Sequence, residues 1–162
     1  MRVSDKLVEE LLVKTKNVLP EQLQTLKDQE QNEKKPLQDV VVAAGLVSEK
    51  ELTEAYAKQI EIPFVDINVK EIPKEVLRLI PERIARQYTV VVYGVDEDGT
   101  KLLAMEDPDD IQAISFLQKE LGTGLKIFIA TRTNILQAID QYRENISSEI
   151  TQVISAEEEQ AQ

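Results

Sequence analysis

The hydrophobic residues of the first 60 positions recur at helical spacing in four short segments. Pro20 and Pro36 suit the first turns of the second and third segments. Gly45 is placed to end the third segment in a left-handed cap, and Ser48 with Glu51 forms a capping-box pattern at the start of the fourth. The expected buried positions are Leu7, Val8, Leu11 and Leu12; Leu23 and Leu26; Leu37, Val40 and Val41; and Leu52, Ala55, Tyr56 and Ile60.

The second pair of helices repeats the pattern of the first pair after 29 residues. The sequence therefore contains two 24-residue units, 7–30 and 36–59, joined by the polar stretch "QNEKK" at 31–35. Each unit predicts a helix, a tight turn and a second helix. Seven apolar positions coincide when the second unit is shifted back by 29 residues. In order, the first unit has Val8, Leu11, Leu12, Val13, Val18, Leu23 and Leu26, and the second unit has Leu37, Val40, Val41, Val42, Val47, Leu52 and Ala55.

From residue 61 the pattern alternates between short strands and helices. Strands are predicted at 62–67, 88–95, 101–106 and 125–130, with "DEDG" at 96–99 as a hairpin turn. Short helices are predicted at 74–79 and 82–87. A longer helix follows, with Asp107 as its cap, Pro108 in its first turn and Ile111, Ile114 and Leu117 facing inward. Thr131 or Thr133 caps the last helix, which sets Ile135, Leu136, Ile139 and Tyr142 against the sheet.

These elements predict an α+β fold in three parts. Residues 1–60 form a four-helix subdomain of two repeated hairpins, and residues 61–143 form a small sheet with helices packed on it. Residues 144–162 contain acids and no bases, and we expect them to form an acidic linker or tail. The three parts carry net charges of about −2, −4 and −5.

Composition excludes several classes of function. The chain of 162 residues has no cysteine and no histidine, which excludes disulfides, thiolate or imidazole zinc sites, and cysteine or histidine catalytic dyads. A net charge of −11 repels nucleic acid. No apolar run is long enough to insert into a membrane and no signal segment opens the chain, so we expect a cytoplasmic protein.

Three motifs have structural explanations that are simpler than a binding site. "DEDG" lacks the further oxygen ligands of a calcium loop and is followed at once by a strand. "EDPDD" at 106–110 fits a helix cap, and "LGTGLK" at 121–126 runs from helix to strand, the reverse of a phosphate loop. We therefore expect no catalytic residues, no metal ligands and no cofactor in this chain.

Several longer motifs together resemble a known family. "GLVSEKELTEAYAKQIEIPFVDI", "IPKEVLRLIPERIARQYTVVVYGV", "LLAMEDPDD" and "TRTNILQAIDQY" are similar to the N-terminal domain of the hexameric ATPases that drive type II secretion and type IV pilus assembly. The similarity covers residues 4–143 and is strongest over 45–110.

The resemblance implies a non-catalytic docking and regulatory domain. Its partners would be the cytoplasmic domain of an inner-membrane secretion or pilus assembly protein and a downstream ATPase core, which alone would hold ATP and magnesium. It implies a cytoplasmic protein, held peripherally at the inner membrane through that partner. An open sheet edge or an apolar groove between the hairpins would provide the docking surface. A third interpretation of the chain is a free-standing adaptor that has lost its motor.

The resemblance also implies an alternative function, because some family members bind cyclic di-GMP through two tandem 24-residue motifs that each open with arginine, leucine, glycine. Here the corresponding residues are Leu7, Val8 and Glu9, and Pro36, Leu37 and Gln38. Both arginines and both glycines are absent, and Glu9 adds negative charge. In this alternative, a cyclic di-GMP-binding domain with degenerate motifs, the expected contacts are Lys6, Lys35 and Leu37.

Overall fold

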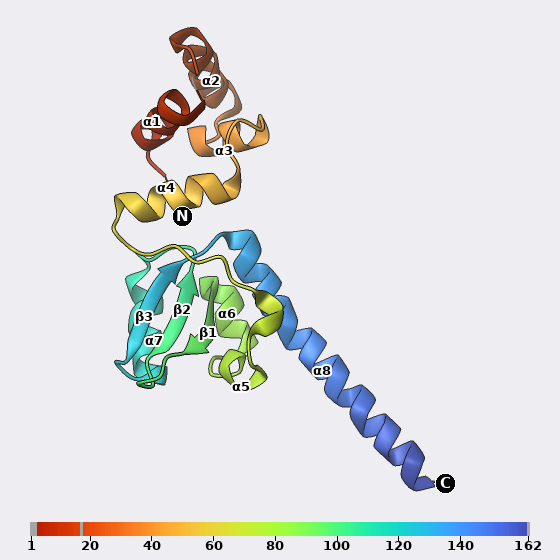
Figure 1. The fold of residues 1–162 in the computed structure, drawn as a ribbon. Helices are drawn as coiled ribbons and strands as arrows, with labels where there is room; N and C mark the ends of the chain where they lie inside the picture. The colour runs from red at the N-terminus through yellow and green to blue at the C-terminus, as the bar shows by residue number, and fades with distance from the viewer. Residues whose placement is uncertain (1–2, 17, 162) are drawn as a thin grey trace. The chain divides into compact units, whose positions relative to one another are not determined.

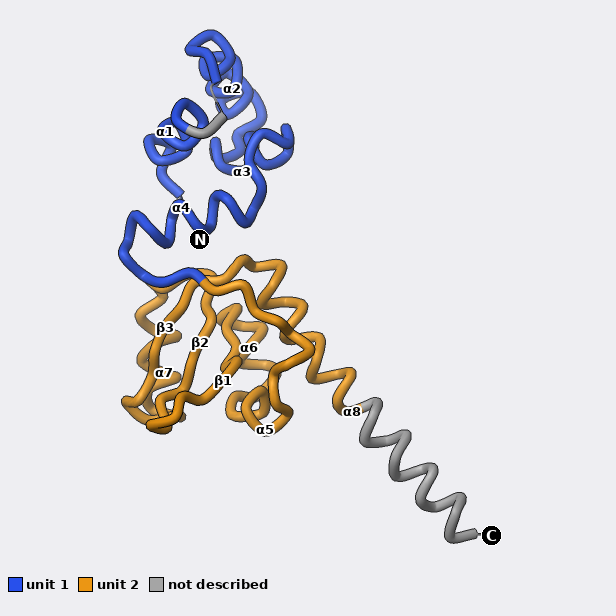
Figure 2. The backbone as a smooth tube through the Cα atoms, in the orientation of Figure 1, with its two compact units in different colours: residues 1–64 blue, residues 65–162 orange. Residues whose placement is uncertain are grey.

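The computed structural model describes residues 3–16 and 18–161, with the side chains of 3–14 and 18–146. The chain divides into two compact units, unit 1 (Met1–Phe64) and unit 2 (Val65–Gln162), shown in different colours in Figure 2. Our predicted boundary lies at residue 60, directly after the last helix of unit 1. Residues 60–64 belong with that unit because Ile60 and Ile62 donate backbone hydrogen bonds to the end of this helix.

Unit 1 consists of four helices in its described part (Figure 1). They are α1 (Asp5–Lys16), α2 (Pro20–Glu33), α3 (Leu37–Ala43) and α4 (Glu49–Gln59). The helix α3 packs against α1 and α2, and α4 packs against α1. The predicted order of two helical hairpins is therefore confirmed, as is the α+β class of the whole chain.

The burial of side chains follows the repeat. Val8 and Leu37 are both fully buried, and so are Leu12 and Val41. Val13 and Val42 are both exposed, although the apolar pattern alone does not separate them from their neighbours. Burial therefore agrees at four of the seven coinciding pairs, since Val18 and Val47 are also both buried, and it differs at Leu11/Val40, Leu23/Leu52 and Leu26/Ala55.

The turn between α3 and α4 forms as its residues predict. Gly45 has a φ of +74°, which a residue with a side chain adopts only at a cost. The backbone N–H of Leu46 donates to Val41 O at 3.1 Å, closing the end of α3. Ser48 Oγ accepts a hydrogen bond from the Glu51 N–H at 3.0 Å and so caps α4.

Unit 2 is built on a three-stranded sheet in the order β1-β2-β3. The strands β1 (Val90–Val95) and β2 (Lys101–Met105) form an antiparallel hairpin. The strand β3 (Leu125–Ile129) runs parallel to β2, so the chain must cross over between them, and α7 (Ile111–Leu121) makes the crossover. Figure 1 shows these elements in colours that run from green at β1 to light blue at β3.

Three further helices and a short 3₁₀ turn complete unit 2. They are η1 (Val69–Glu71), α5 (Lys74–Leu77), α6 (Glu82–Tyr88) and α8 (Arg132–Ala161). The core of this unit is aliphatic, and its fully buried large side chains are Leu77, Ile80, Leu103, Met105, Leu117, Ile129, Ile135 and Ile139. Thr131 caps α8, because its Oγ1 accepts from the Asn134 N–H at 3.1 Å.

Residues 62–67 do not form the predicted strand. Val65 makes one ladder-like bond, from its N–H to Ile129 O at 2.8 Å. The Asn134 side chain forms two hydrogen bonds with the backbone of Ile67: it accepts from the Ile67 N–H at 2.8 Å and donates to the Ile67 carbonyl at 3.1 Å. Pro63 has no N–H to donate. The segment is extended, but a side chain rather than a neighbouring strand satisfies much of its backbone.

Two expectations at α7 are corrected. The cap is Asp110, whose Oδ1 accepts from the Ala113 N–H at 3.1 Å, whereas Asp107 accepts from the Asp109 N–H within the preceding turn. Of the three predicted inward residues, Leu117 is buried and Ile114 packs partly buried against the core, so only Ile111 is wrong. Ile111 is 74% exposed, and Ala113 with Leu117 faces the core.

The helix α8 continues past the predicted end of the α+β subdomain to Ala161. The sequence "ENISSEITQVISAEEEQA" contains neither glycine nor proline and is rich in glutamate, glutamine and alanine, which favour helix. The expected linker therefore begins as a helix. Its role as a connection to another domain stays a prediction.

Ionisation of the Tyr142 hydroxyl is expected to lower the free energy of unfolding at alkaline pH. Its hydroxyl lies 2.7 Å from the carbonyl oxygens of Leu77 and Ile80, to which it donates, and burial raises the pKa of Tyr142 to about 12. In the unfolded chain tyrosine ionises near pH 10. Stability that is fully present below pH 10 should therefore fall as the pH rises to about 12, by at most about 2–3 kcal/mol for this residue.

The measurement is denaturant unfolding of unit 2 at pH 9 and at pH 11.5, for the wild type and for Tyr142→Phe. We expect the wild type to lose more stability over this interval than the variant. The variant keeps every lysine and the other tyrosines, which also titrate in this pH interval. The difference between the two losses of stability is therefore due to Tyr142. Equal losses would show that this hydroxyl is not held protonated by its surroundings.

Candidate functional site

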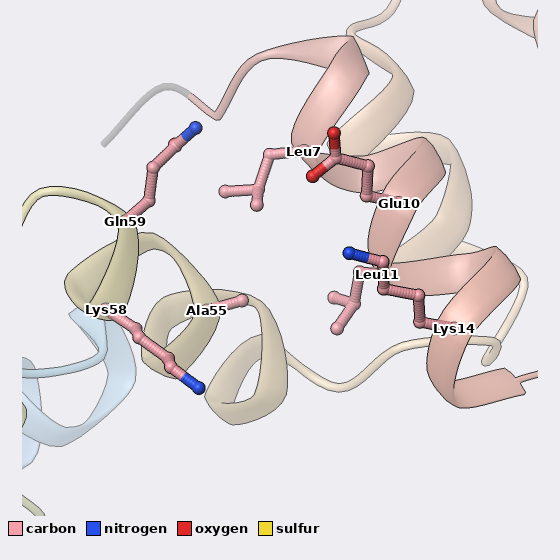
Figure 3. Close-up of a pocket in the computed structure, with 7 residues that line it drawn as sticks. All are labelled: Leu7, Glu10, Leu11, Lys14, Ala55, Lys58 and Gln59. Atoms are coloured by element: carbon pink, nitrogen blue, oxygen red, sulfur yellow. The ribbon is translucent and has the colours of Figure 1, made fainter.

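An apolar groove lies between α1 and α4 in unit 1 (Figure 3). It is lined by Leu7, Glu10, Leu11, Lys14, Ala55, Lys58 and Gln59, and its volume is about 330 Å³. We call it the α1–α4 groove. Leu7, Leu11 and Ala55 make its apolar floor, and the four polar side chains surround them.

The groove arises because α1 has more apolar residues than its own hairpin can bury. Val8 and Leu12 are fully buried in the core of unit 1, whereas Leu7 and Leu11 are only partly buried. The facing helix α4 presents Ala55 at the position that Leu26 occupies in the first repeat. Leu26 is buried, whereas the shorter side chain of Ala55 leaves the space between α4 and α1 open.

The polar rim of the groove has an ordered charge pattern. Glu10 comes one turn before Lys14 on α1, and Figure 3 shows Glu10 and Gln59 beside Leu7, with Lys14 and Lys58 beside Leu11 and Ala55. Among the described residues, no hydrogen bond or ion pair to these four side chains is found. One end of the groove is therefore acidic and amide-bearing, and the other end is basic.

A second hollow of unit 1 is polar. It is lined by Asp5, Glu30, Gln31, Lys34, Lys35 and Pro36, with a volume of about 510 Å³. Desolvation by burial, followed by a hydrogen bond and repulsion from the Asp5 carboxylate, raises the pKa of Glu30. The two lysines are thus offset by two acids, so the hollow offers no net positive charge to an anion.

The structure does not bring the three predicted dinucleotide contacts together in one site. Lys35 lines the polar hollow, Lys6 is exposed on α1, and Leu37 is fully buried in the core of unit 1. At the motif positions, Glu9 pairs with Lys27 at 2.7 Å, and Gln38 accepts a hydrogen bond from the Val3 N–H. These positions serve the packing of unit 1 itself.

Sequence reasoning missed the residues of the α1–α4 groove other than its floor. Helical spacing assigns Leu7 and Leu11 to the core together with Val8 and Leu12, because it cannot tell which side of a wide apolar face meets a partner. One signal could have located the groove. Comparing the two repeats shows alanine at position 55 where the first repeat has leucine at position 26.

Two kinds of site are relevant to the rest of the described chain, a metal centre and an unpaired buried polar group. No cluster of three or more acidic side chains placed to hold a metal ion is found there, and every buried side-chain nitrogen or oxygen has a hydrogen-bond partner. The "DEDG" motif is the predicted turn, in which Asp98 accepts from the Thr100 N–H at 3.1 Å. Hydrogen bonds from the side chain and then the backbone of Thr100 lower the pKa of Asp98.

Within the part of the chain that the structure describes, no helix combines the length and the apolar composition needed to span a bilayer.

Comparison with known proteins finds consistent relatives. The MshEN domain family matches residues 60–149. The chain is 27% identical over 134 residues to the type IV pilus assembly ATPase PilB of Myxococcus xanthus. The matched stretch covers 82% of this chain but only 23% of PilB, which is much longer. Among solved structures it is similar to MshE with cyclic di-GMP (cdg), with a TM-score of 0.61 and 28% identity over 87% of this chain and 99% of that one.

The N-terminal domain of XpsE shares the fold, with a TM-score of 0.55 and 23% identity over 86% of this chain and 96% of that one. The chain thus spans less than a quarter of the pilus ATPase that it matches, and nearly the whole of each solved domain.

Proposed function

The chain belongs to the MshEN domain family, and from this premise we propose that it docks a secretion or pilus motor onto its membrane assembly. The predicted resemblance to N-terminal domains of type II secretion and type IV pilus assembly ATPases is confirmed, and a domain of this kind is not itself catalytic. The proposed partner is the cytoplasmic part of an inner-membrane assembly protein. The observation that carries the proposal is the match to PilB over 82% of this chain.

The described surface supports docking. A docking domain needs an accessible apolar surface with polar groups around it, and the α1–α4 groove has both. Unit 2 adds exposed apolar side chains at Val95 and Ile111, 46% and 74% exposed.

In this proposal the chemistry of the motor lies in a domain that follows this one. The relatives are several times longer than this chain, so we place ATP and magnesium in a downstream core. The helical, acidic end of α8 is suited to leave unit 2 toward such a core. The domain would act at the cytoplasmic face of the inner membrane through its partner.

Co-purification tests the proposal. The 162-residue chain, tagged, should retain the cytoplasmic segment of an inner-membrane assembly protein encoded by the same genome, at micromolar concentrations of both. An unrelated acidic helical protein of similar size serves as the control for nonspecific retention. Absence of any complex with the assembly proteins of both the secretion and the pilus systems would contradict the proposal.

A second candidate function is the binding of cyclic di-GMP. It is favoured by the similarity to MshE with cyclic di-GMP, which extends over 87% of this chain. The loss of both arginines and glycines argues against it, as does the balanced charge around Lys35. Calorimetric titration with cyclic di-GMP tests this function. Binding heat that saturates at micromolar concentration would establish it, and no binding heat at high concentration would exclude it.

A further inference from the structure

The floor of the α1–α4 groove suits aliphatic side chains. Leu7 and Leu11 are one helical turn apart on α1, and Ala55 faces them from α4. No aromatic ring lines the groove, so a base or another flat ring would find no surface on which to stack. Leucine or isoleucine side chains from a partner would instead bury the exposed parts of both leucines.

The dimensions of the groove fit a helix. From Leu7 to Lys14 the helix α1 advances seven residues, which at 1.5 Å per residue is about 10 Å, or two helical turns. Two residues spaced i and i+4 on an approaching helix are about 6 Å apart along its axis, which matches the rise from Leu7 to Leu11. Docking of this kind places an amphipathic helix in a groove between two others.

The charges at the two ends set the direction of that helix. Its C-terminal end carries partial negative charge, which Lys14 and Lys58 would stabilise. Its N-terminal end carries partial positive charge, which Glu10 would stabilise. Acidic side chains in its last turn and basic ones in its first turn would strengthen both effects.

We propose that the α1–α4 groove binds an amphipathic helix of another protein, with two aliphatic residues four positions apart entering between Leu7, Leu11 and Ala55 and an acidic C-terminal turn lying against Lys14 and Lys58. Only the identity of the partner, the inner-membrane assembly protein, rests on the proposed function. The groove itself is a property of unit 1.

A designed peptide serves as the probe. It is a fluorescein-labelled helix of about four turns with two leucines four positions apart, lysines in its first turn and glutamates in its last turn. The matched control has the same composition with the lysines and glutamates exchanged. Fluorescence anisotropy with the full chain should show saturable binding of the probe and binding about tenfold weaker for the control.

Variants locate the binding. Ala55→Leu narrows the floor of the groove with the residue that the first repeat has at this position, and it should abolish binding without loss of stability. Leu11→Gln should also abolish it, whereas Val13→Gln, which changes an exposed residue of the same helix, should not. Lys14→Glu together with Lys58→Glu should make the control peptide the tighter ligand.

Four results would overturn the proposal: no binding of the probe at millimolar concentration, equal binding of the two peptides, full binding to Ala55→Leu, or displacement of the probe by cyclic di-GMP. The last would assign the groove to the dinucleotide. Failure here is separable from failure of the proposed function. If Ala55→Leu still co-purifies with the assembly protein, the domain docks through another surface, and if only the peptide binds, the groove stands without that partner.

Discussion

Leu37→Ala is expected to lower the free energy of unfolding of unit 1 by about 2–5 kcal/mol. Leu37 is fully buried, and it opens α3, the helix that packs against both α1 and α2. Removing three carbons there leaves a cavity that the surrounding helices can close only in part. A helical unit of this size has a total stability of about 5 kcal/mol, so the variant should leave much of unit 1 unfolded.

Amide hydrogen exchange measures this effect residue by residue. Protection in α1 to α4 should fall, whereas protection in β1 and β2 should stay, because each unit has its own core. Val42→Ala is the matched control, since Val42 lies on the same helix but is 37% exposed, and it should cost less than about 1 kcal/mol. An equal effect of the two substitutions would show that the repeat does not determine the core of unit 1.

Restoring the arginine and glycine positions is expected to raise the affinity for cyclic di-GMP by about two to four orders of magnitude. The variant is Leu7→Arg, Glu9→Gly, Pro36→Arg and Gln38→Gly. Each new arginine adds a charge-assisted contact of about 1.5–3 kcal/mol. Replacing Glu9 also releases Lys27, which Glu9 holds at 2.7 Å, and removes one negative charge near a doubly negative ligand.

The control separates charge from the motif. Leu7→Lys and Pro36→Lys add the same charge without the planar guanidinium, so they should recover only a small part of the gain. Circular dichroism checks that α1 persists, because Glu9→Gly costs its helix about 1 kcal/mol. If the arginine variant gains nothing while remaining folded, the repeat of this chain has diverged beyond the geometry of the binding motif.

Local signals in the sequence predicted the helices of unit 1 well. Gly45 and Ser48 act only on their own turn, and the structure shows the left-handed glycine and the serine cap where the pattern expects them. The hairpin around "DEDG" was predictable for the same reason. Where a single residue determines the backbone conformation, the sequence is sufficient.

Features that depend on distant contacts were not predictable in this way. The segment 62–67 has the composition of a strand, but Asn134, 67 residues from Ile67, takes its hydrogen bonds. At α7 two aspartates compete to cap the helix, and the packing of Ala113 and Leu117 on the sheet favours Asp110 over Asp107. Local propensity does not distinguish these alternatives.

The candidate site lies between these cases. The four leucine and valine positions of α1 identify an apolar face, but only the arrangement of α4 shows that Leu7 and Leu11 remain partly open. The predicted contacts Lys6, Lys35 and Leu37 followed from the family motif rather than from packing. The burial of Leu37 gives this motif position a role in the core of unit 1.

Hydrogen exchange of the full 162-residue chain with and without saturating ligand tests most directly whether this domain handles a protein rather than a messenger nucleotide. With the cytoplasmic segment of its inner-membrane assembly protein, we predict slower exchange over a contiguous surface of the chain. Saturation with cyclic di-GMP should leave every amide unchanged. Protection by the dinucleotide together with none from the protein segment would contradict the account.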